Sequence, residues 1–348
     1  MSATDDPATE HTADPHPTPE DALVVLDLHF GTLYASALRT AAVHRIPDHL
    51  TRGPLAVDEL ARRAGVRADP LRRVLRLLAS RGIFRETEPG VYTLTATAAL
   101  LQDAPGSLRD MVLFGTSDMM VRACARLDEA VRTGRPAFDV VHGAPFFDYL
   151  AAHPDAQARF DNGMASLSGP LDDVIAATYP FPDSGTVVDV GGGQGSLLAA
   201  VLRRHPGLTG VLFDQERTVA GHRLDSGELA GRWRVESGDF FTAVPAGGDR
   251  YFLKHILHDW DDEECLRILR AVRAVVPPDG RLVAVDTVMP EGDTPDLSKT
   301  LDVAMLAVLK GRERTRDEFA SLFERGGFRL TRVIDTPGFP ALVEAEPV

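Results

Sequence analysis

The feature that most constrains this chain is a run of glycines directly after a short apolar segment. Residues 187–195 read VVDVGGGQG, and residues 196–204 (SLLAAVLRR) carry the spacing of an amphipathic helix. The glycines therefore lie at a strand-to-helix junction. Because glycine lacks a Cβ and adopts positive φ, a ligand can lie against bare backbone N–H groups at the helix N-terminus. This arrangement predicts a nucleotide-type cofactor site in an α/β fold.

Glycine spacing separates two kinds of cofactor loop. The dinucleotide pattern G-x-G-x-x-G is not met, because its third position is Ser196. The pattern D-x-G-x-G-x-G is met in full, by Asp189, Gly191, Gly193 and Gly195. Asp214 follows the next apolar run, residues 208–213, where a carboxylate suits the hydroxyls of a ribose. That carboxylate indicates a nucleoside without distinguishing between cofactors.

Two further segments follow in order. Residues 233–236 form a third strand-like run, and Gly238-Asp239-Phe240 comes directly after it. An acid and an aromatic at a strand end can bind and stack on adenine, although Gly-Asp is also common turn chemistry. The fourth segment, residues 250–262 (RYFLKHILHDWDD), brings two histidines beside several acids.

Taken in this order, the motifs resemble those of the plant caffeate and isoflavone O-methyltransferases and their bacterial relatives. The resemblance covers the chain from about residue 23. It is carried by the glycine motif, Asp214, Gly238-Asp239, Lys254, His258-Asp259-Trp260 and residues 311–315 (GRERT). It implies a class I methyltransferase fold, an α/β Rossmann-like architecture with a seven-stranded mixed sheet. An α-rich, winged-helix-like dimerisation domain precedes that sheet.

The resemblance also implies roles for single residues. His258 matches the general base, and Asp286 and Glu313 match its acidic partners. Asp286 stands where plant members usually have Glu, so a direct contact with His258 and a contact through water both stay open. The implied cofactor contacts are Ser168, Asp189, Gly191, Gly193, Gly195, Asp214, Gln215, Gly238, Asp239, Phe240 and Lys254. The implied substrate contacts are Phe160, Met164, Asp259 and Met305, although the two methionines and the phenylalanine equally suit core packing.

The expected reaction is methyl transfer from S-adenosyl-L-methionine (SAM) to a phenolic hydroxyl, releasing S-adenosyl-L-homocysteine (SAH). A phenol is mostly protonated at neutral pH, so a positioned base such as His258 accelerates the transfer. The expected acceptor is a small polyketide-derived aromatic, of the orsellinate or naphthoate type, in antibiotic biosynthesis. The alternative is a relative that binds SAM but acts as a hydroxylase or decarboxylase. No metal is expected, because the acids of residues 259–264 open a helix predicted at 265–275.

Composition limits the remaining possibilities. A formal net charge of −14 over 348 residues disfavours general nucleic-acid binding and anionic membranes. The two cysteines, Cys124 and Cys265, have neither disulfide nor zinc spacing. No apolar run is long enough to span a bilayer, and residues 1–20 lack the blocks of a signal peptide, so a cytoplasmic protein is expected. The expected domains are a disordered tail (1–20), a dimerisation domain (21–100), a helical linker (101–180) and a SAM-binding domain (181–348).

The N-terminal region supports one alternative from another class. We expect helices over residues 23–46 and 57–64, a third with Asp69 as its N-cap, and a hairpin around Pro89-Gly90. Helix, helix and hairpin make a winged-helix arrangement, which many DNA-binding regulators use. Residues 51–85 carry nine arginines against three acids, a local net charge of +6. The acidic chain as a whole opposes DNA, and the resemblance to the O-methyltransferases implies that this domain forms a homodimer instead.

Overall fold

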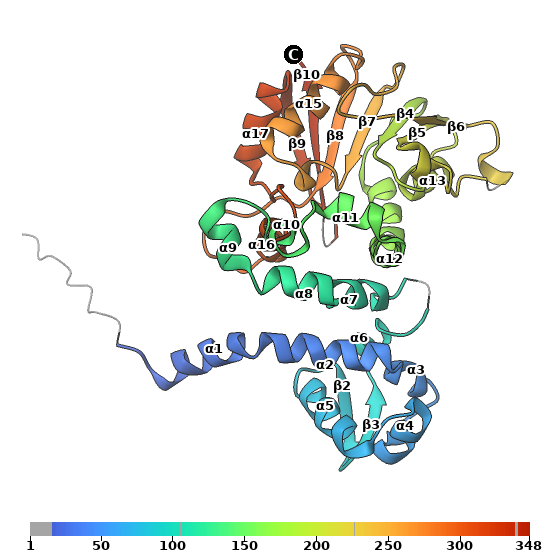
Figure 1. Ribbon diagram of the computed structural model, residues 1–348. Helices are drawn as coiled ribbons and strands as arrows, with labels where there is room; N and C mark the ends of the chain where they lie inside the picture. Colours follow the sequence, from blue (N-terminus) through green and yellow to red (C-terminus); the bar gives the residue numbers. More distant parts are fainter. Residues whose placement is uncertain (1–15, 105, 226, 338–339) are drawn as a thin grey trace, which may run out of the picture. The chain divides into compact units, whose positions relative to one another are not determined.

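The computed structural model describes residues 16–104, 106–225, 227–337 and 340–348. The chain divides into two compact units, one up to residue 98 and one from residue 99 onward (Figure 1). Residues 1–15, which make up most of the predicted tail, lie outside the described residues. The first helix begins at Pro19, and Thr18 caps it through a reciprocal capping box with Asp21.

The first unit packs helices against a small antiparallel sheet. Its helices are α1 (Pro19–His29), α2 (Gly31–Val43), α3 (Ile46–His49), α4 (Val57–Ala64) and α5 (Ala68–Ser80). Its strands, in sheet order, are β1 (Leu55–Ala56), β3 (Val91–Leu94) and β2 (Phe84–Glu88). The amphipathic face of α5 buries Leu71, Leu75 and Leu78 against this core. A short helix, α6 (Ala96–Ala99), follows the hairpin.

Residues 23–46 are largely helical, as predicted, with a 45° bend at Phe30 between α1 and α2. One local expectation for this unit was wrong. The helix predicted to start after Asp69 begins at Ala68, with Arg67 at its N-cap. Asp69 therefore lies in the first turn, where its charge still complements the positive helix end. Of the arginines that suggested DNA binding, Arg62 pairs with Glu59 in the same helix.

Helix α1 exposes most of its apolar side chains. Leu23, Val25 and Leu28 are 65%, 67% and 77% exposed. Among the described residues, no helix taken alone has the length and apolar content to cross a membrane. Only the bent pair α1 and α2, counted together, meets those two criteria.

The second unit joins a helical segment to a seven-stranded sheet (Figure 1). The helical segment comprises α7 (Arg109–Gly115), α8 (Asp118–Cys124), α9 (Leu127–Thr133), α10 (Ala137–His142), α11 (Phe146–Ala152) and α12 (Pro154–Thr178). The strands lie in the order β6 (Trp233–Ser237), β5 (Leu208–Asp214), β4 (Gly185–Val190), β7 (Arg250–Lys254), β8 (Arg281–Asp286), β10 (Ala341–Pro347) and β9 (Phe328–Ile334). Between the strands lie α13 (Ser196–Arg204), α14 (Glu216–Val219), α15 (Asp262–Arg273), α16 (Leu297–Val308) and α17 (Arg316–Arg325).

Sheet topology fixes where a ligand can bind. Strands β6, β5, β4, β7 and β8 are parallel neighbours, whereas β10 runs antiparallel to both of its neighbours, β8 and β9. From β4 the chain builds outward to β5 and β6 on one side, and then to β7 and β8 on the other. In such sheets ligands bind at the carboxyl ends of the strands where the order reverses. The loops after β4 and β7 therefore border the expected site.

Helices cover both faces of the sheet. Side chains from α12 and α13 bury one face, against Val187, Phe252 and Val283. Helices α15 and α17 bury the other face, against alternate residues of the same strands, such as Val188 and Leu253. The predicted helix at 265–275 begins earlier than expected, at Asp262, because Asp261 caps it through the Glu264 N–H. The acids predicted to open this helix do occupy its first turn.

Candidate active site

The loop after β4 has the backbone conformation that its glycines predict. Gly191, Gly193 and Gly195 have φ of +70°, +60° and +84°, and Gly195 is the N-cap of α13. A Cβ on Gly191 would lie 2.5 Å from Cδ1 of Ile256. That contact brings the loop against the segment that carries His258. We call residues 189–195 the glycine loop.

Asp214, at the end of β5, faces the glycine loop. Its Oδ2 accepts from the Gly193 N–H at 2.9 Å, and its Oδ1 accepts from the Gln215 N–H at 2.6 Å. Each carboxylate oxygen can accept two hydrogen bonds, so both keep capacity for ribose hydroxyls. The structure thus brings Asp214 and Gln215 to the place that the motif order predicts.

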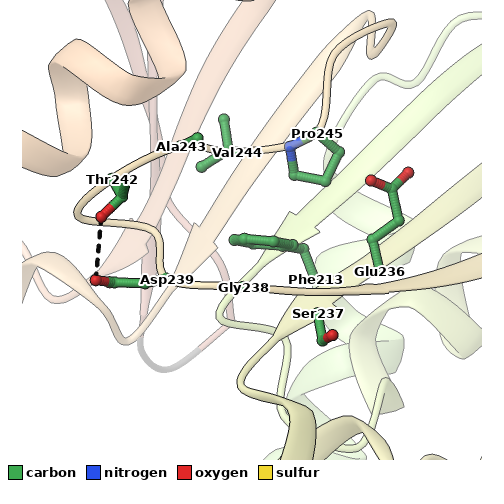
Figure 2. Close-up of a pocket in the computed structure, with 9 residues that line it drawn as sticks. All are labelled: Phe213, Glu236, Ser237, Gly238, Asp239, Thr242, Ala243, Val244 and Pro245. Carbon is green, nitrogen blue, oxygen red and sulfur yellow. Dashed lines mark hydrogen bonds between the residues drawn. The ribbon is translucent and has the colours of Figure 1, made fainter.

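The end of β6 borders a hollow of about 360 Å³ (Figure 2). Asp239 lies on its rim, where it accepts from the Phe241 N–H at 2.9 Å and from the Thr242 hydroxyl at 3.3 Å. The hollow is lined by Phe213, Glu236, Ser237, Gly238, Asp239, Thr242, Ala243, Val244 and Pro245. Phe240 does not line it; its ring instead lies beside the glycine loop, 3.4 Å from where a Gly191 Cβ would be.

The first residue of the glycine loop and two charged groups on other elements are largely buried. Asp189 is 1% exposed, and among the described residues neither of its oxygens has a hydrogen-bond partner. Burial raises the pKa of Asp189 to about 7. Lys254 Nζ lies 2.6 Å from Asp172 Oδ1 and 3.5 Å from Ser168 Oγ, both on α12.

Asp172 was missed from the sequence. It is 2% exposed and shares the buried face of α12 with Ile175 and Ala176, three and four residues on. An acid at helical spacing from apolar residues of a buried face is the sequence signal that would have identified Asp172. Together, the orphaned Asp189 carboxylate, the buried ion pair of Asp172 with Lys254 and the open glycine backbone fit a nucleoside cofactor with a charged amino-acid end.

His258 lies in a short 3-10 turn (Leu257–Asp259) between two carboxylates. Its Nδ1 is 2.9 Å from Glu313 Oε1, and its Nε2 is 3.4 Å from Asp259 Oδ1. Glu313 is 1% exposed, accepts from the Thr287 hydroxyl, and has its own N–H bonded to Asp302 Oδ1 at 2.9 Å. The partner carboxylate of His258 is therefore itself rigidly held. Thr287 and Asp302 are part of this site and were not predicted.

The loop carrying Glu313 is fixed against the His258 turn. A Cβ on Gly311 would lie 1.8 Å from the His258 carbonyl oxygen, so only glycine permits this approach. Arg314, 1% exposed, donates to the Leu257 carbonyl at 2.8 Å and to Asp262 Oδ1 at 2.9 Å. The contacts of Gly311 and Arg314 thus hold residues 311–315 in place and keep Glu313 beside the imidazole.

Asp286 does not contact His258 in the way that Glu313 does. It ends β8, is 0% exposed, and has no hydrogen-bond partner among the described residues. Its Oδ1 lies 3.8 Å from Nδ1 of His255, not of His258. Burial raises the pKa of Asp286 to about 8. The metal-ligating atoms that His255, His258 and Asp286 would offer all lie within 4.8 Å of one another.

Charge sets the protonation of His258. Burial opposes its charged form, but the carboxylates of Asp259, Asp286 and Glu313 outweigh burial and raise the pKa of His258 to about 10. Burial likewise raises the pKa of Asp259, to about 6. In the absence of ligand, these acids therefore favour the protonated form of the imidazole.

An aromatic cluster lies on the helical side of the second unit. Phe160 on α12 is 5.5 Å, between ring centroids, from both Phe114 and Phe146. Met164 packs on the same cluster. Met305 on α16 is half-buried and lies two and three residues before Ala307 and Val308, which belong to the cluster. Phe147 stacks on Trp260 at 5.8 Å, which joins the cluster to the segment after His258. Three predicted acceptor residues thus lie in or near apolar packing that reaches Trp260, two residues after His258.

Comparison with known proteins agrees with this geometry. The O-methyltransferase domain family matches residues 124–329, and the O-methyltransferase dimerisation domain matches residues 26–103. The phenazine O-methyltransferase of Lysobacter antibioticus is 40% identical over 328 residues, covering 93% of this chain and 96% of that protein. The O-demethylpuromycin O-methyltransferase of Streptomyces alboniger is 40% identical over 338 residues, covering 93% and 89%.

The solved structures give the same result. CalO1, a methyltransferase in calicheamicin biosynthesis with SAH bound, has a TM-score of 0.89 and 41% identity, covering 96% of this chain and 100% of that one. The predicted fold class and family resemblance are therefore confirmed. The chain belongs to the SAM-dependent O-methyltransferases of the kind that serve antibiotic and other secondary-metabolite biosynthesis.

Proposed function

We propose that this enzyme methylates a phenolic hydroxyl of a small aromatic acceptor, with His258 as general base and without a metal. The observation that carries the proposal is the His258–Glu313 pair, 2.9 Å between Nδ1 and Oε1, beside the glycine loop. A carboxylate on one ring nitrogen fixes the tautomer and leaves the other nitrogen to take a proton. Ile256, two residues before His258, packs close to Gly191, which supports a position of the imidazole near the cofactor loop.

Bound SAM supplies a methyl group already activated on a sulfonium sulfur. Asp214 and the loop backbone would hold its ribose, Asp239 and Phe240 its adenine, and Asp189 its charged amino-acid end. The enzyme's own chemical task is then to align the acceptor oxygen and accept its proton at His258 Nε2. Alignment contributes up to about 7–11 kcal/mol in favourable cases, and a positioned base about 10²–10⁴-fold in rate.

The charge around His258 bears on when it can act as a base. With a pKa of about 10 in the unliganded protein, the imidazole carries a proton at neutral pH. A bound cation nearby lowers the pKa of a histidine, because it disfavours the charged form. Cofactor binding therefore increases the fraction of neutral His258, which couples the base to the loaded site.

The acceptor class follows from the apolar surroundings and from relatives. Phe160, Met164 and Met305 would line the aromatic side of the pocket, and Asp259 its polar edge. The related structure of NcsB1 holds 1,4-dihydroxy-2-naphthoic acid with SAH. Some relatives are named as N-methyltransferases, so a nitrogen acceptor is the outcome that would correct this proposal. A naphthoate- or orsellinate-type phenol suits the site best.

The test is a panel of hydroxylated and aminated aromatic acids incubated with methyl-labelled SAM, followed by mass spectrometry. We expect labelled methyl ethers and an equal amount of SAH, with activity unchanged by EDTA. Methylation only of amines would contradict the choice of oxygen. SAM binding without SAH release for every acceptor would favour the non-methylating alternative. Loss of activity in EDTA, restored by a divalent metal, would contradict the metal-free mechanism.

We also propose that the enzyme is a homodimer through its first unit. The support is the matched dimerisation domain and the apolar side chains that α1 exposes, among them Val25 and Leu28. Light scattering should give twice the chain mass for wild type and the single mass for Val25→Lys combined with Leu28→Lys. Val131→Lys, at a 72% exposed site on α9, is the matched control and should stay dimeric.

A further inference from the structure

His255 has a backbone conformation that its side chain disfavours. It follows β7 directly and has φ of +53°, in the left-handed region that residues with a Cβ rarely adopt. Its N–H is satisfied by the Val285 carbonyl at 3.0 Å, so the strained turn is tied to the neighbouring strand. Such strain is typically retained where it aims a side chain at a functional site.

The His255 ring lies beside the His258 ring. The two ring centroids are 5.4 Å apart and the planes are tilted by 33°. The His255 side chain is 30% exposed and that of His258 is 16% exposed, so each ring keeps some surface that a ligand can contact. Asp286, fully buried and otherwise without a partner, lies 3.8 Å from the His255 Nδ1.

These contacts limit the charge of His255. Asp286 Oδ1 lies 3.8 Å from His255 Nδ1, beyond hydrogen-bond distance, so no hydrogen bond between them fixes the tautomer of the ring. Loss of water around the ring and the nearby charges of His258 and Lys254 hold the pKa of His255 well below its usual range. The ring is therefore neutral, and a neutral imidazole offers one N–H donor and one acceptor nitrogen to a ligand.

We propose that His255, beside Asp286, is a specificity-determining residue that hydrogen-bonds a second polar group on the acceptor, next to the hydroxyl that is methylated. The inference rests on the proposed function and refines its substrate class. One ring nitrogen of each imidazole lies within 4.8 Å of the other, and a ring nitrogen bonds a hydroxyl or amine at about 2.8 Å. Donors on adjacent ring carbons satisfy both nitrogens. The preferred acceptor is thus an ortho-dihydroxy or ortho-amino-hydroxy aromatic.

The test measures acceptor binding, which does not depend on turnover. The dissociation constants of 2,3-dihydroxynaphthalene and 2-naphthol are measured by calorimetry in the presence of SAH. Wild type should bind the diol about tenfold more tightly, since one hydrogen bond contributes roughly that factor. His255→Gly, which suits the positive φ, should bring the ratio of the two constants close to one while 2-naphthol binds as before.

The matched control is Arg45→Gly, because Arg45 is the other described non-glycine residue with positive φ, at +51°. Arg45→Gly relieves backbone strain but keeps the His255 imidazole, so the ratio of the two dissociation constants should stay as in wild type. A ratio of one in wild type, or a ratio that persists in His255→Gly, would overturn the proposal. So would equal weakening of both ligands, which indicates a structural role, or a ratio abolished by EDTA, which indicates a metal.

Methylation of the same two compounds keeps this inference distinct from the proposed function. If wild type prefers the diol but methylates neither compound, the specificity role stands and the phenol methylation fails. If it methylates both without any preference in binding, phenol methylation stands and the role of His255 fails.

Discussion

The glycine loop approaches the segment that carries His258 where Gly191 meets Ile256, but the loop and the His258 site depend on different kinds of group. The glycine loop relies on backbone: three positive φ values and N–H groups that no larger residue could place there. The His258 site relies on side-chain charge, with one imidazole between Glu313 and Asp259 and a second beside Asp286. The loop should therefore be sensitive to any added Cβ, whereas the His258 site should be sensitive to changes in charge at constant volume.

Removing the imidazole of His258 should have the largest effect. His258→Gln should lower kcat by about 10²–10⁴-fold, because the acceptor proton loses its positioned base. Affinity for SAH should change less than twofold, since the glycine loop stays intact. Steady-state kinetics and calorimetry check both values, with His222→Gln, beside Trp233, as the control histidine. Full activity in His258→Gln would remove the base assignment.

Neutralising Glu313 should have the next largest effect. Glu313→Gln should lower kcat about 10–100-fold, as is typical when an orienting carboxylate is lost. The carboxylate helps to raise the pKa of His258, so its loss lowers that pKa. Because the rate rises as His258 loses its proton, the rising limb of the pH–rate profile should move to lower pH.

The control for Glu313→Gln is Thr287→Val, which removes one hydroxyl donor to Glu313 without changing charge. It should reduce kcat less and leave the rising limb almost in place. A limb that stays in place in Glu313→Gln as well would show that Glu313 does not set the protonation of His258.

The contrast between the two regions also explains what could be predicted from the sequence. Positive φ at alternate positions favours glycine there, so the spacing of the glycines predicts the loop. Asp214 was predictable because the carboxyl ends of neighbouring parallel strands meet at one sheet edge.

The charge relations of the His258 site were beyond such reasoning. Asp286 and Glu313 both matched acidic partners of His258. Which of them hydrogen-bonds the imidazole depends on the path of residues 311–315, which Gly311 and Arg314 fix. Asp172 and Thr287 belong to elements far away in sequence, and only tertiary packing brings them to Lys254 and Glu313. The role of His255 depends on a backbone angle that no spacing encodes.

Adding a methyl group to the glycine loop should have a moderate effect. Gly191→Ala places a Cβ 2.5 Å from Ile256 Cδ1 at a φ of +70°, and should weaken SAH binding about tenfold. Gly193→Ala meets no atom within 4 Å although its φ is +60°, so it should weaken binding less. Calorimetry with SAH checks the order. Equal losses would show that conformation alone, and not the contact with Ile256, limits residue 191.

Asp189→Asn should have the smallest effect. It should increase the stability of the unliganded enzyme. Burial raises the pKa of Asp189 from 3.8 to about 7, so ionising it costs folding free energy as pH rises between these values. Removing that charge should stabilise the unliganded enzyme by about 1–3 kcal/mol at pH 8 and by less at pH 5. Thermal unfolding at both pH values checks the trend, with Asp173→Asn, at an exposed position on α12, as the control that should leave stability unchanged. The same variant should bind SAH less tightly, because the carboxylate that destabilises the empty loop is the one that would hold the cofactor's charged end. A gain in stability at pH 8 with undiminished SAH binding would show that Asp189 shapes the loop without binding the cofactor.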